Sequence, residues 1–188
     1  MNYIFPNNPL WIPIETVNDY KKDFIAEFKK NGWRCDTYMT EEGLTLWTKR
    51  KTIIKDLLPI TRSKLSLLPV GTVIDGELID KRTKDTKDYY YAFDILYHQG
   101  ESVMHLPWKE RRELLEKVVD PLGVEISEPI ALGFSNMYKI ALEQGDEGIV
   151  LKNINSKYLV NLRSCPDNPN WLKAKRPEAH FVNKEATK

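Results

Sequence analysis

The segment Glu27-Phe28-Lys29-Lys30-Asn31-Gly32-Trp33-Arg34 places a lysine directly before a tight turn, with charged residues on both sides. The residues around it predict strands at Ile25–Phe28 and Trp33–Met39, joined through the Asn-Gly turn. A second turn at 41–43 leads into a third strand at Leu44–Thr48. This part of the chain is therefore predicted to be a meander of short strands.

The rest of the chain predicts a mixture of strands and helices. Ile53–Leu68 has apolar residues at helical spacing that are interrupted by Pro59, which predicts a broken helix. The remaining predictions are strands at Thr72–Ile79, Tyr89–Leu96, Val124–Glu128, Glu147–Lys152 and Trp171–Lys175, helices at Trp108–Val119 and Asn136–Gln144, an irregular stretch through Pro13 and a charged loop at Asp80–Asp88. Thr72–Ile79 and Tyr89–Leu96 are predicted to pair. The predicted class is α+β, with mainly antiparallel sheets flanked by helices.

The composition is that of a globular domain. Of 188 residues, 41% are hydrophobic and 29% are charged. No apolar run approaches the ~20 residues needed to cross a bilayer, and the first residues lack the pattern of a secretory signal. Cys35 and Cys165 form neither a disulfide framework nor a metal-ligand spacing. We therefore expect a monomer in the cytoplasm or nucleoplasm, without a membrane partner.

Positive charge is concentrated towards the end of the chain. The net charge is +1, yet residues 152–188 contain eight Lys or Arg and three Asp or Glu, an excess of five. From charge alone, a solvated surface is the simpler interpretation and a nucleic-acid partner is the alternative.

Lys29 needs activation to act as a nucleophile, because a free lysine has a pKa of about 10.4 and is almost fully protonated at pH 7. Nearby cations and partial desolvation lower the pKa of such a group. Lys173 and Lys175 are two residues apart in a predicted strand and therefore lie on one face. The same two cations can hold a triphosphate and stabilise charge that develops during phosphoryl transfer.

Four further segments follow the first one in order. They are Asp75-Gly76-Glu77-Leu78, Tyr91-Ala92-Phe93-Asp94, Glu147-Gly148-Ile149-Val150-Leu151-Lys152 and Trp171-Leu172-Lys173-Ala174-Lys175. Together the five segments resemble the ordered motifs of the covalent nucleotidyltransferase superfamily, which contains ATP-dependent DNA ligases, RNA ligases and mRNA capping enzymes. The resemblance implies the ATP-grasp-like nucleotidyltransferase fold of that superfamily. Glu147-Gly148 is similar to the ligase pattern, because capping enzymes usually carry Asp-Gly there. Asn31 is a departure from the first motif, because DNA ligases and capping enzymes usually carry Asp at that position, whereas RNA ligases vary more.

The resemblance implies that Lys29 attacks the α-phosphate of ATP and retains AMP in a phosphoramidate bond, with release of pyrophosphate. AMP then passes to a 5′-phosphate at a nick. It further implies that Glu27 reads the exocyclic amine of the purine and that Arg34 contacts sugar or phosphate. Phe93 is implied to stack on the base, and Val150 to cover its opposite face.

The remaining implied roles belong to charged residues. The resemblance implies that Glu77 contacts the ribose hydroxyl, that Lys152 approaches the α-phosphate, and that Lys173 and Lys175 act as catalytic cations on the triphosphate. It also implies that Glu147, together with Glu77, holds Mg²⁺. Asp75 shares the side of its strand with Glu77, and we expect it to orient backbone or a neighbouring basic group.

The domain organisation is predicted as a nucleotidyltransferase domain at 1–177 and a polar tail at 178–188. Eleven residues follow Pro177, whereas the oligonucleotide-binding barrel of superfamily ligases needs about 25–30 residues for its five strands alone, so we expect no barrel. The preferred function is the catalytic core of an ATP-dependent DNA ligase, acting on a nicked duplex. The alternatives are an RNA ligase or capping guanylyltransferase core, and a non-catalytic nucleotide- or nick-binding module.

Overall fold

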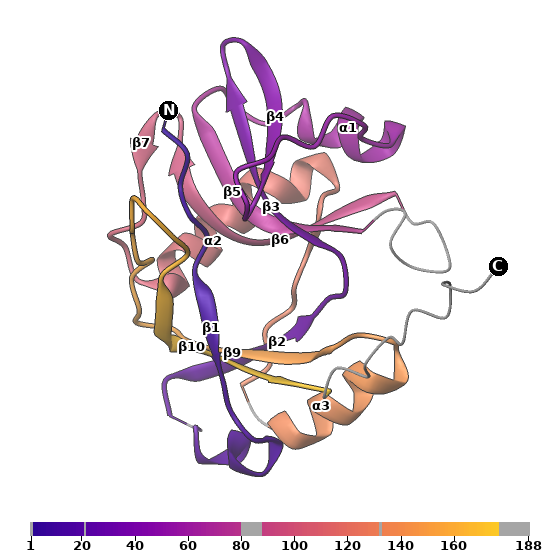
Figure 1. Ribbon diagram of the computed structural model, residues 1–188, viewed down its shortest axis with the longest axis vertical. Coiled ribbons are helices and arrows are strands. Elements are labelled where there is room, and N and C mark those ends of the chain that lie inside the picture. The colour runs from indigo at the N-terminus through magenta and orange to yellow at the C-terminus, as the bar shows by residue number, and fades with distance from the viewer. Residues whose placement is uncertain (1, 21, 80–87, 132, 177–188) are drawn as a thin grey trace, which may run out of the picture.

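The chain forms two β-sheets that lie one above the other (Figure 1). The computed structural model describes residues 2–20, 22–79, 88–131 and 133–176. The smaller sheet has the strand order β1-β10-β9-β2, with β1 at Asn8–Trp11, β2 at Phe24–Lys29, β9 at Gly148–Asn153 and β10 at Asp167–Lys175. The larger sheet has the order β4-β3-β5-β6-β7 with β8 beside β6; its strands are β3 (Trp33–Thr40), β4 (Gly43–Thr48), β5 (Thr72–Ile79), β6 (Tyr89–His98), β7 (Glu101–Ser102) and β8 (Glu125–Ile126).

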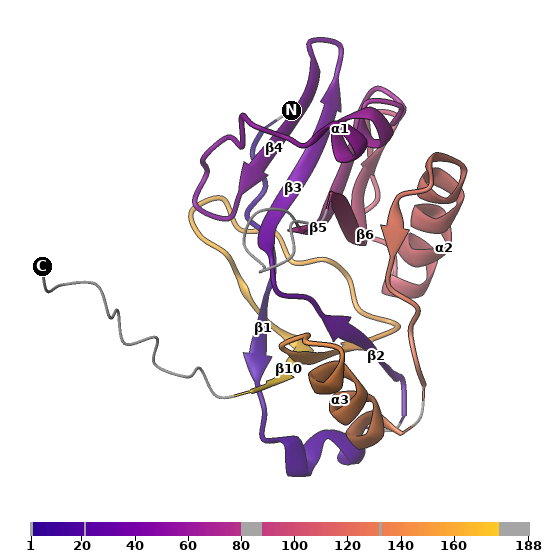
Figure 2. The same ribbon diagram turned by 90° about the vertical axis from the view of Figure 1, so that its right-hand side faces the viewer.

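Helices cover the outer faces of both sheets (Figure 2). α1 (Pro59–Leu65) and α2 (Trp108–Val119), followed by the short η2 (Asp120–Leu122), pack their apolar residues against the larger sheet. α3 (Phe134–Glu143) and η1 (Ile14–Asp19) pack against the smaller one. Because successive side chains of a strand point to opposite faces, the polar residues of the strands are left on the inner faces, between the two sheets.

A third apolar cluster joins the two sheets directly. It combines Tyr38, Val73 and Leu96 of the larger sheet with Trp171 of the smaller one, and the N-terminal Ile4 packs with them. The two sheets are therefore in direct apolar contact.

The predicted class is confirmed, and the pairing of Thr72–Ile79 with Tyr89–Leu96 is confirmed as β5 and β6. Most pairs are antiparallel, while β1–β10 and β6–β8 are parallel. Residues 80–87 of the predicted charged loop, and the predicted tail at 178–188, lie outside the described residues.

The predicted meander is wrong at its first step. β3 and β4 form the expected hairpin, but β2 pairs with β9, and β3 pairs with β5. The chain therefore passes from one sheet to the other at Lys30–Gly32. The local sequence carries the turn signal but not the identity of the strand that each side will pair with.

Two further predictions need correction. The stretch before Pro13 is not wholly irregular, because β1 adds to the edge of the smaller sheet beside β10. Pro59 does not break a helix but begins one, since the first turn of a helix does not need the N–H that proline lacks.

Candidate active site

All ten predicted site residues line one cleft of about 990 Å³, whose walls come from both sheets. They are Glu27, Lys29, Arg34, Glu77, Phe93, Glu147, Val150, Lys152, Lys173 and Lys175. The sequence motifs, which span most of the chain, therefore converge on a single place. The specific roles implied for these residues remain predictions.

The register of the smaller sheet determines which residues lie side by side on the floor of the cleft. Lys29 lies opposite Gly148, which lies opposite Lys175, and in the next row Glu27, Val150 and Lys173 follow one another. Gly148 is required here because a Cβ on it would lie 2.1 Å from the carbonyl oxygen of Ala174. The prediction that Lys173 and Lys175 share one face of a strand is confirmed by these rows.

The Lys29 ammonium has a carboxylate partner, with its Nζ 2.6 Å from Oε2 of Glu147. The neighbouring Lys30 makes a parallel contact, with its Nζ 2.8 Å from Oδ2 of Asp146. Burial, followed by the ammonium groups of Lys29, Lys175 and Lys49, lowers the pKa of Lys173. The cleft thus brings several cations close enough to repel one another. A bound anionic ligand would relieve this repulsion.

Glu77 lies on β5 above the turn that follows Lys29. The N–H of Gly32 donates to its Oε1 over 3.0 Å, and a side chain at Gly32 would collide with the backbone of Leu78 and with Glu77 itself. Burial raises the pKa of Glu77 to about 7; the charge of Glu147 adds to the rise, and those of Lys29 and Arg34 oppose it. Glycine in the turn therefore lets Lys29 approach this carboxyl group.

A raised pKa of Glu77 makes folding stability depend on pH. In the unfolded chain the group has an ordinary carboxyl pKa, so its contribution is fully present below about pH 4.5 and is lost as the pH rises through about 7. Relative to Glu77→Gln, the wild-type chain should lose about 1–3 kcal/mol of unfolding free energy between pH 4.5 and 8. Denaturant titrations in EDTA measure this, and a constant difference between the two proteins would contradict it.

Asp75 holds Arg34 in place, as predicted for it. The two carboxylate oxygens accept from Nε and Nη2 of Arg34, both over 2.5 Å. Tyr158 also donates its hydroxyl to Asp75, and the backbone N–H of Asn7 donates to that hydroxyl. Because every one of these groups is positioned by another, the guanidinium of Arg34 is fixed before any ligand arrives.

Phe93 is half-buried on the cleft side of β6, with its ring close to two cations. The Arg34 guanidinium carbon lies 5.3 Å from the ring centre and the Lys152 Nζ 5.7 Å from it. The Lys152 Nζ also lies 4.4 Å from the ring centre of Trp171 and 2.7 Å from Oε2 of Glu27. Lys152 is thus almost completely buried beneath the aromatic wall of the cleft.

Replacing Phe93 with alanine should weaken nucleotide binding by about 1–3 kcal/mol, the scale of base–aromatic stacking, and leave the fold intact. Phe93→Trp should bind nearly as well. Calorimetric titration with a nucleotide measures the change, and a thermal scan checks folding. If Phe93→Ala instead loses its cooperative thermal transition, the ring serves the core and not a base.

Several cleft residues were missed by the sequence motifs. The exposed Lys49 and Arg50 follow β4 and line the cleft opposite its lysine-rich floor, and Trp33 stands at its edge. The basic run Lys49-Arg50-Lys51 directly after a strand was the available signal for the first two. Outside the cleft lining, Nη1 of Arg112 on α2 lies 3.6 Å from Oε1 of Glu27, and this residue had no sequence signal beyond its helical position.

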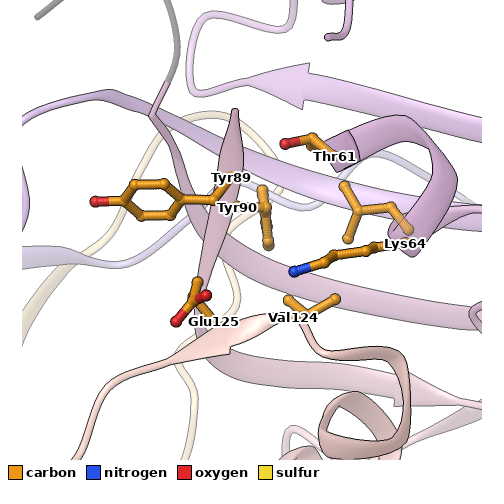
Figure 3. A pocket seen from close by; sticks show the side chains of 7 residues that line it. Thr61, Lys64, Tyr89, Tyr90, Val124 and Glu125 are labelled. Carbon is orange, nitrogen blue, oxygen red and sulfur yellow. The ribbon is translucent and has the colours of Figure 1, made fainter. Parts of the chain in front are cut away.

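A narrow crevice lies apart from the cleft, between α1 and the β6–β8 edge (Figure 3). Thr61 and Lys64 of α1 line one side of it, and Tyr89, Tyr90, Val124 and Glu125 line the other. The Lys64 ammonium donates to the carbonyl of Gly123. The crevice has no room for a water molecule and therefore serves as a packing contact.

The carboxyl groups of the cleft suit a hard cation that also binds phosphate. Glu147 lies close enough to Glu77 for its charge to contribute to the raised pKa of Glu77. Within the described ranges, no three His, Cys, Asp or Glu side chains are gathered for a metal ion. Two carboxylates fit magnesium, which commonly takes its other ligands from water and substrate phosphate.

Comparisons with known proteins agree with this geometry. The structure of a mycobacterial DNA ligase D complexed with ATP and MES superposes with a TM-score of 0.74 at 20% identity, covering 92% of this chain and 60% of that one. The fold is therefore that of the nucleotidyltransferase domains of DNA ligases.

A family model described as the ATP dependent DNA ligase domain matches residues 64–175, and the chain belongs to that family. The DNA ligase of Nanoarchaeum equitans is 40% identical over 167 residues, covering 71% of this chain and 30% of that protein. A prophage-derived DNA ligase-like protein of Bacillus subtilis, LigB, is 29% identical over 178 residues, covering 85% and 63%. The chain thus spans less than two thirds of either relative. None of its described helices has the length and apolar character to cross a membrane.

Proposed function

We propose that this chain is the adenylyltransferase core of an ATP-dependent DNA ligase, with residues 1–177 as the catalytic domain and Lys29 as the site of AMP attachment. The observation that carries the proposal is the position of Lys29. It stands on the cleft floor beside Glu147 and in register with Lys175, where the chain passes from one sheet to the other. Family membership supports the same assignment.

The chemistry begins with proton loss from the Lys29 ammonium, which leaves its Nζ with a free electron pair. That pair bonds to the α-phosphorus of ATP as the bond to the bridging oxygen of the β-phosphate breaks. Pyrophosphate leaves with the bond electrons, and Nζ gives up a second proton to become a phosphoramidate. Lys173 and Lys175 line the same cleft, and their positive charges would stabilise the negative charge of the transferring and leaving phosphates.

The nucleoside part of ATP is expected to contact both walls of the cleft. Phe93 and Val150 provide apolar surfaces for the base, and Glu77 stands near Lys29 to receive a ribose hydroxyl. Glu147 and Glu77 would hold magnesium, which neutralises triphosphate charge when it is bound. Glu147 contacts the Lys29 ammonium, and Glu77 accepts a hydrogen bond from the N–H of Gly32, so both carboxyl groups are held close to Lys29.

Intact mass measurement after incubation with ATP or GTP and Mg²⁺ tests the proposal. We expect a gain of one AMP with ATP and no gain with GTP. A gain of GMP would favour a capping-type enzyme, and no gain with either nucleotide would favour a binding module. Sealing assays with nicked DNA and nicked RNA then identify the acceptor.

A DNA acceptor predicts a basic contact surface at the cleft, formed by Lys49 and Arg50. Because each neutralised phosphate releases counterions, changing both residues to alanine should reduce the salt slope of nicked-duplex binding by roughly 1–2. Lys109→Ala with Lys117→Ala is the matched control, since both residues are exposed on α2 outside the cleft. Equal slopes for the two double variants would show that DNA does not contact Lys49 and Arg50.

A further inference from the structure

Two adjacent arginines of α2 are buried, and they differ in how they are satisfied. Arg111 donates to both carboxylate oxygens of Asp94 and to the carbonyls of Leu106 and Ser156. Arg112 is 6% exposed, yet its Nη1 has no hydrogen-bond acceptor among the described residues. Oε1 of Glu27 lies 3.6 Å from this Nη1, beyond hydrogen-bond length, so Arg112 and Glu27 are paired through charge.

Arg112 belongs to a row of alternating charges that runs from the cleft to the surface. The Lys152 Nζ lies 2.7 Å from Oε2 of Glu27, Oε1 of Glu27 lies 3.6 Å from Nη1 of Arg112, and Nε of Arg112 lies 2.7 Å from Oε1 of Glu116. The first three side chains are almost completely buried, whereas Glu116 is 43% exposed. The Glu27 carboxylate is therefore held between two cations, one from each side.

The two oxygens of Glu27 differ in availability. Oε2 is occupied by Lys152, while Oε1 has charge contact with Arg112 but no hydrogen bond within the described part of the chain. Glu27 lies in one cross-strand row with Val150 and Lys173 on the cleft floor. Oε1 is itself buried in this structure, and it is the Glu27 oxygen that still has an acceptor position to offer a base that enters the cleft.

We infer that Arg112 is a positioning residue for nucleotide recognition. It holds the Glu27 carboxylate against rotation, so that Oε1 accepts a hydrogen bond from the exocyclic amine of adenine, and it thereby sets the preference for purines that carry this amine. The inference rests on the proposed function and adds to it a specificity determinant from outside the five motifs. Arg112 itself need not touch the nucleotide.

Binding measurements with non-reacting nucleotides test this separately from catalysis. The probes are ATP with a methylene bridge between its α- and β-phosphates, and the same compound with purine in place of adenine, which lacks the amine. We expect the wild-type protein to bind the first about 10-fold tighter, because a hydrogen bond to a carboxylate is lost with the second. In Arg112→Met the preference should fall below about threefold, and Arg112→Lys should restore most of it.

A merely structural role would give a different pattern. In Arg112→Met we expect the KM for ATP in self-adenylylation to rise about 10-fold while kcat changes less than about threefold, because the reacting groups are untouched. Lys117→Met removes a charge from an exposed position of the same helix and should leave the preference at its wild-type value. Thermal scans establish that each variant is folded, and Arg112→Lys keeps the test open if Arg112→Met is not.

Two results with the Arg112→Met variant overturn the inference. One is an unchanged preference in folded Arg112→Met, and the other is an equal loss of affinity for both probes. A wild-type protein that binds neither probe contradicts the proposed function as well. A wild-type protein that binds both probes equally well removes Glu27 as the reader of the amine, and the role of Arg112 with it.

Discussion

Lys29→Ala should abolish covalent attachment of AMP, with no adduct detectable by intact mass after incubation with ATP and Mg²⁺. Alanine has no group that can form the phosphoramidate, and no other lysine occupies the place beside Glu147 in the described structure. The variant should remain folded, because the Lys29 side chain is partly exposed and its ion pair is of the weakly stabilising kind.

Lys30→Ala is the matched control, since Lys30 follows Lys29 in the chain and has an equivalent ion pair with Asp146. It should still accept AMP, and peptide mapping of the wild-type adduct should locate the label at Lys29. An adduct on Lys29→Ala, or a label on Lys30 in the wild-type protein, would show that the nucleophile has been misassigned.

Arg111→Ala should lower the free energy of unfolding by about 3–5 kcal/mol. The guanidinium is fully buried and satisfied by Asp94 and two carbonyls, so its removal leaves the buried Asp94 carboxylate without its counter-ion. Urea or guanidinium titration followed by tryptophan fluorescence measures the change. Since Asp94 follows Phe93, the variant should also bind nucleotide less well.

Arg163→Ala is the comparison for this effect because Arg163 is exposed. It should change the unfolding free energy by less than about 0.5 kcal/mol. A similar loss for both variants would mean that the Arg111–Asp94 pair has no special weight in the fold.

The sequence predicted which residues would lie together better than it predicted the topology. Motif residues two apart in a strand share a face, so the alternation rule alone placed Lys173 with Lys175 and Asp75 with Glu77. Each motif lies on a different predicted strand, so the sequence also indicated which strands would carry the site residues. Their convergence on one cleft followed once the strands had paired.

Pairing partners were the part that local sequence could not give. The Asn31-Gly32 turn looks like a hairpin, yet β2 pairs with β9, whose residues lie more than a hundred positions later. Long-range contacts likewise brought β1 to β10 and Arg112 to Glu27. In each case the partner is chosen by packing over long sequence separations, which a short pattern does not encode.

The passage between sheets at Lys30–Gly32 has a consequence for how the protein folds. Strands β3 to β8 are contiguous in sequence, so the larger sheet forms from nearby segments, whereas β2 must wait for β9 and β10. Closing so long a loop is entropically costly and slow, which makes the smaller sheet the late-forming unit. Lys29 therefore gains Glu147 as a neighbour only when β9 docks, and Lys173 and Lys175 only when β10 docks. A nascent or truncated chain that lacks β10 is expected to have no functional site. Binding of a nucleotide would therefore indicate that the chain has folded completely.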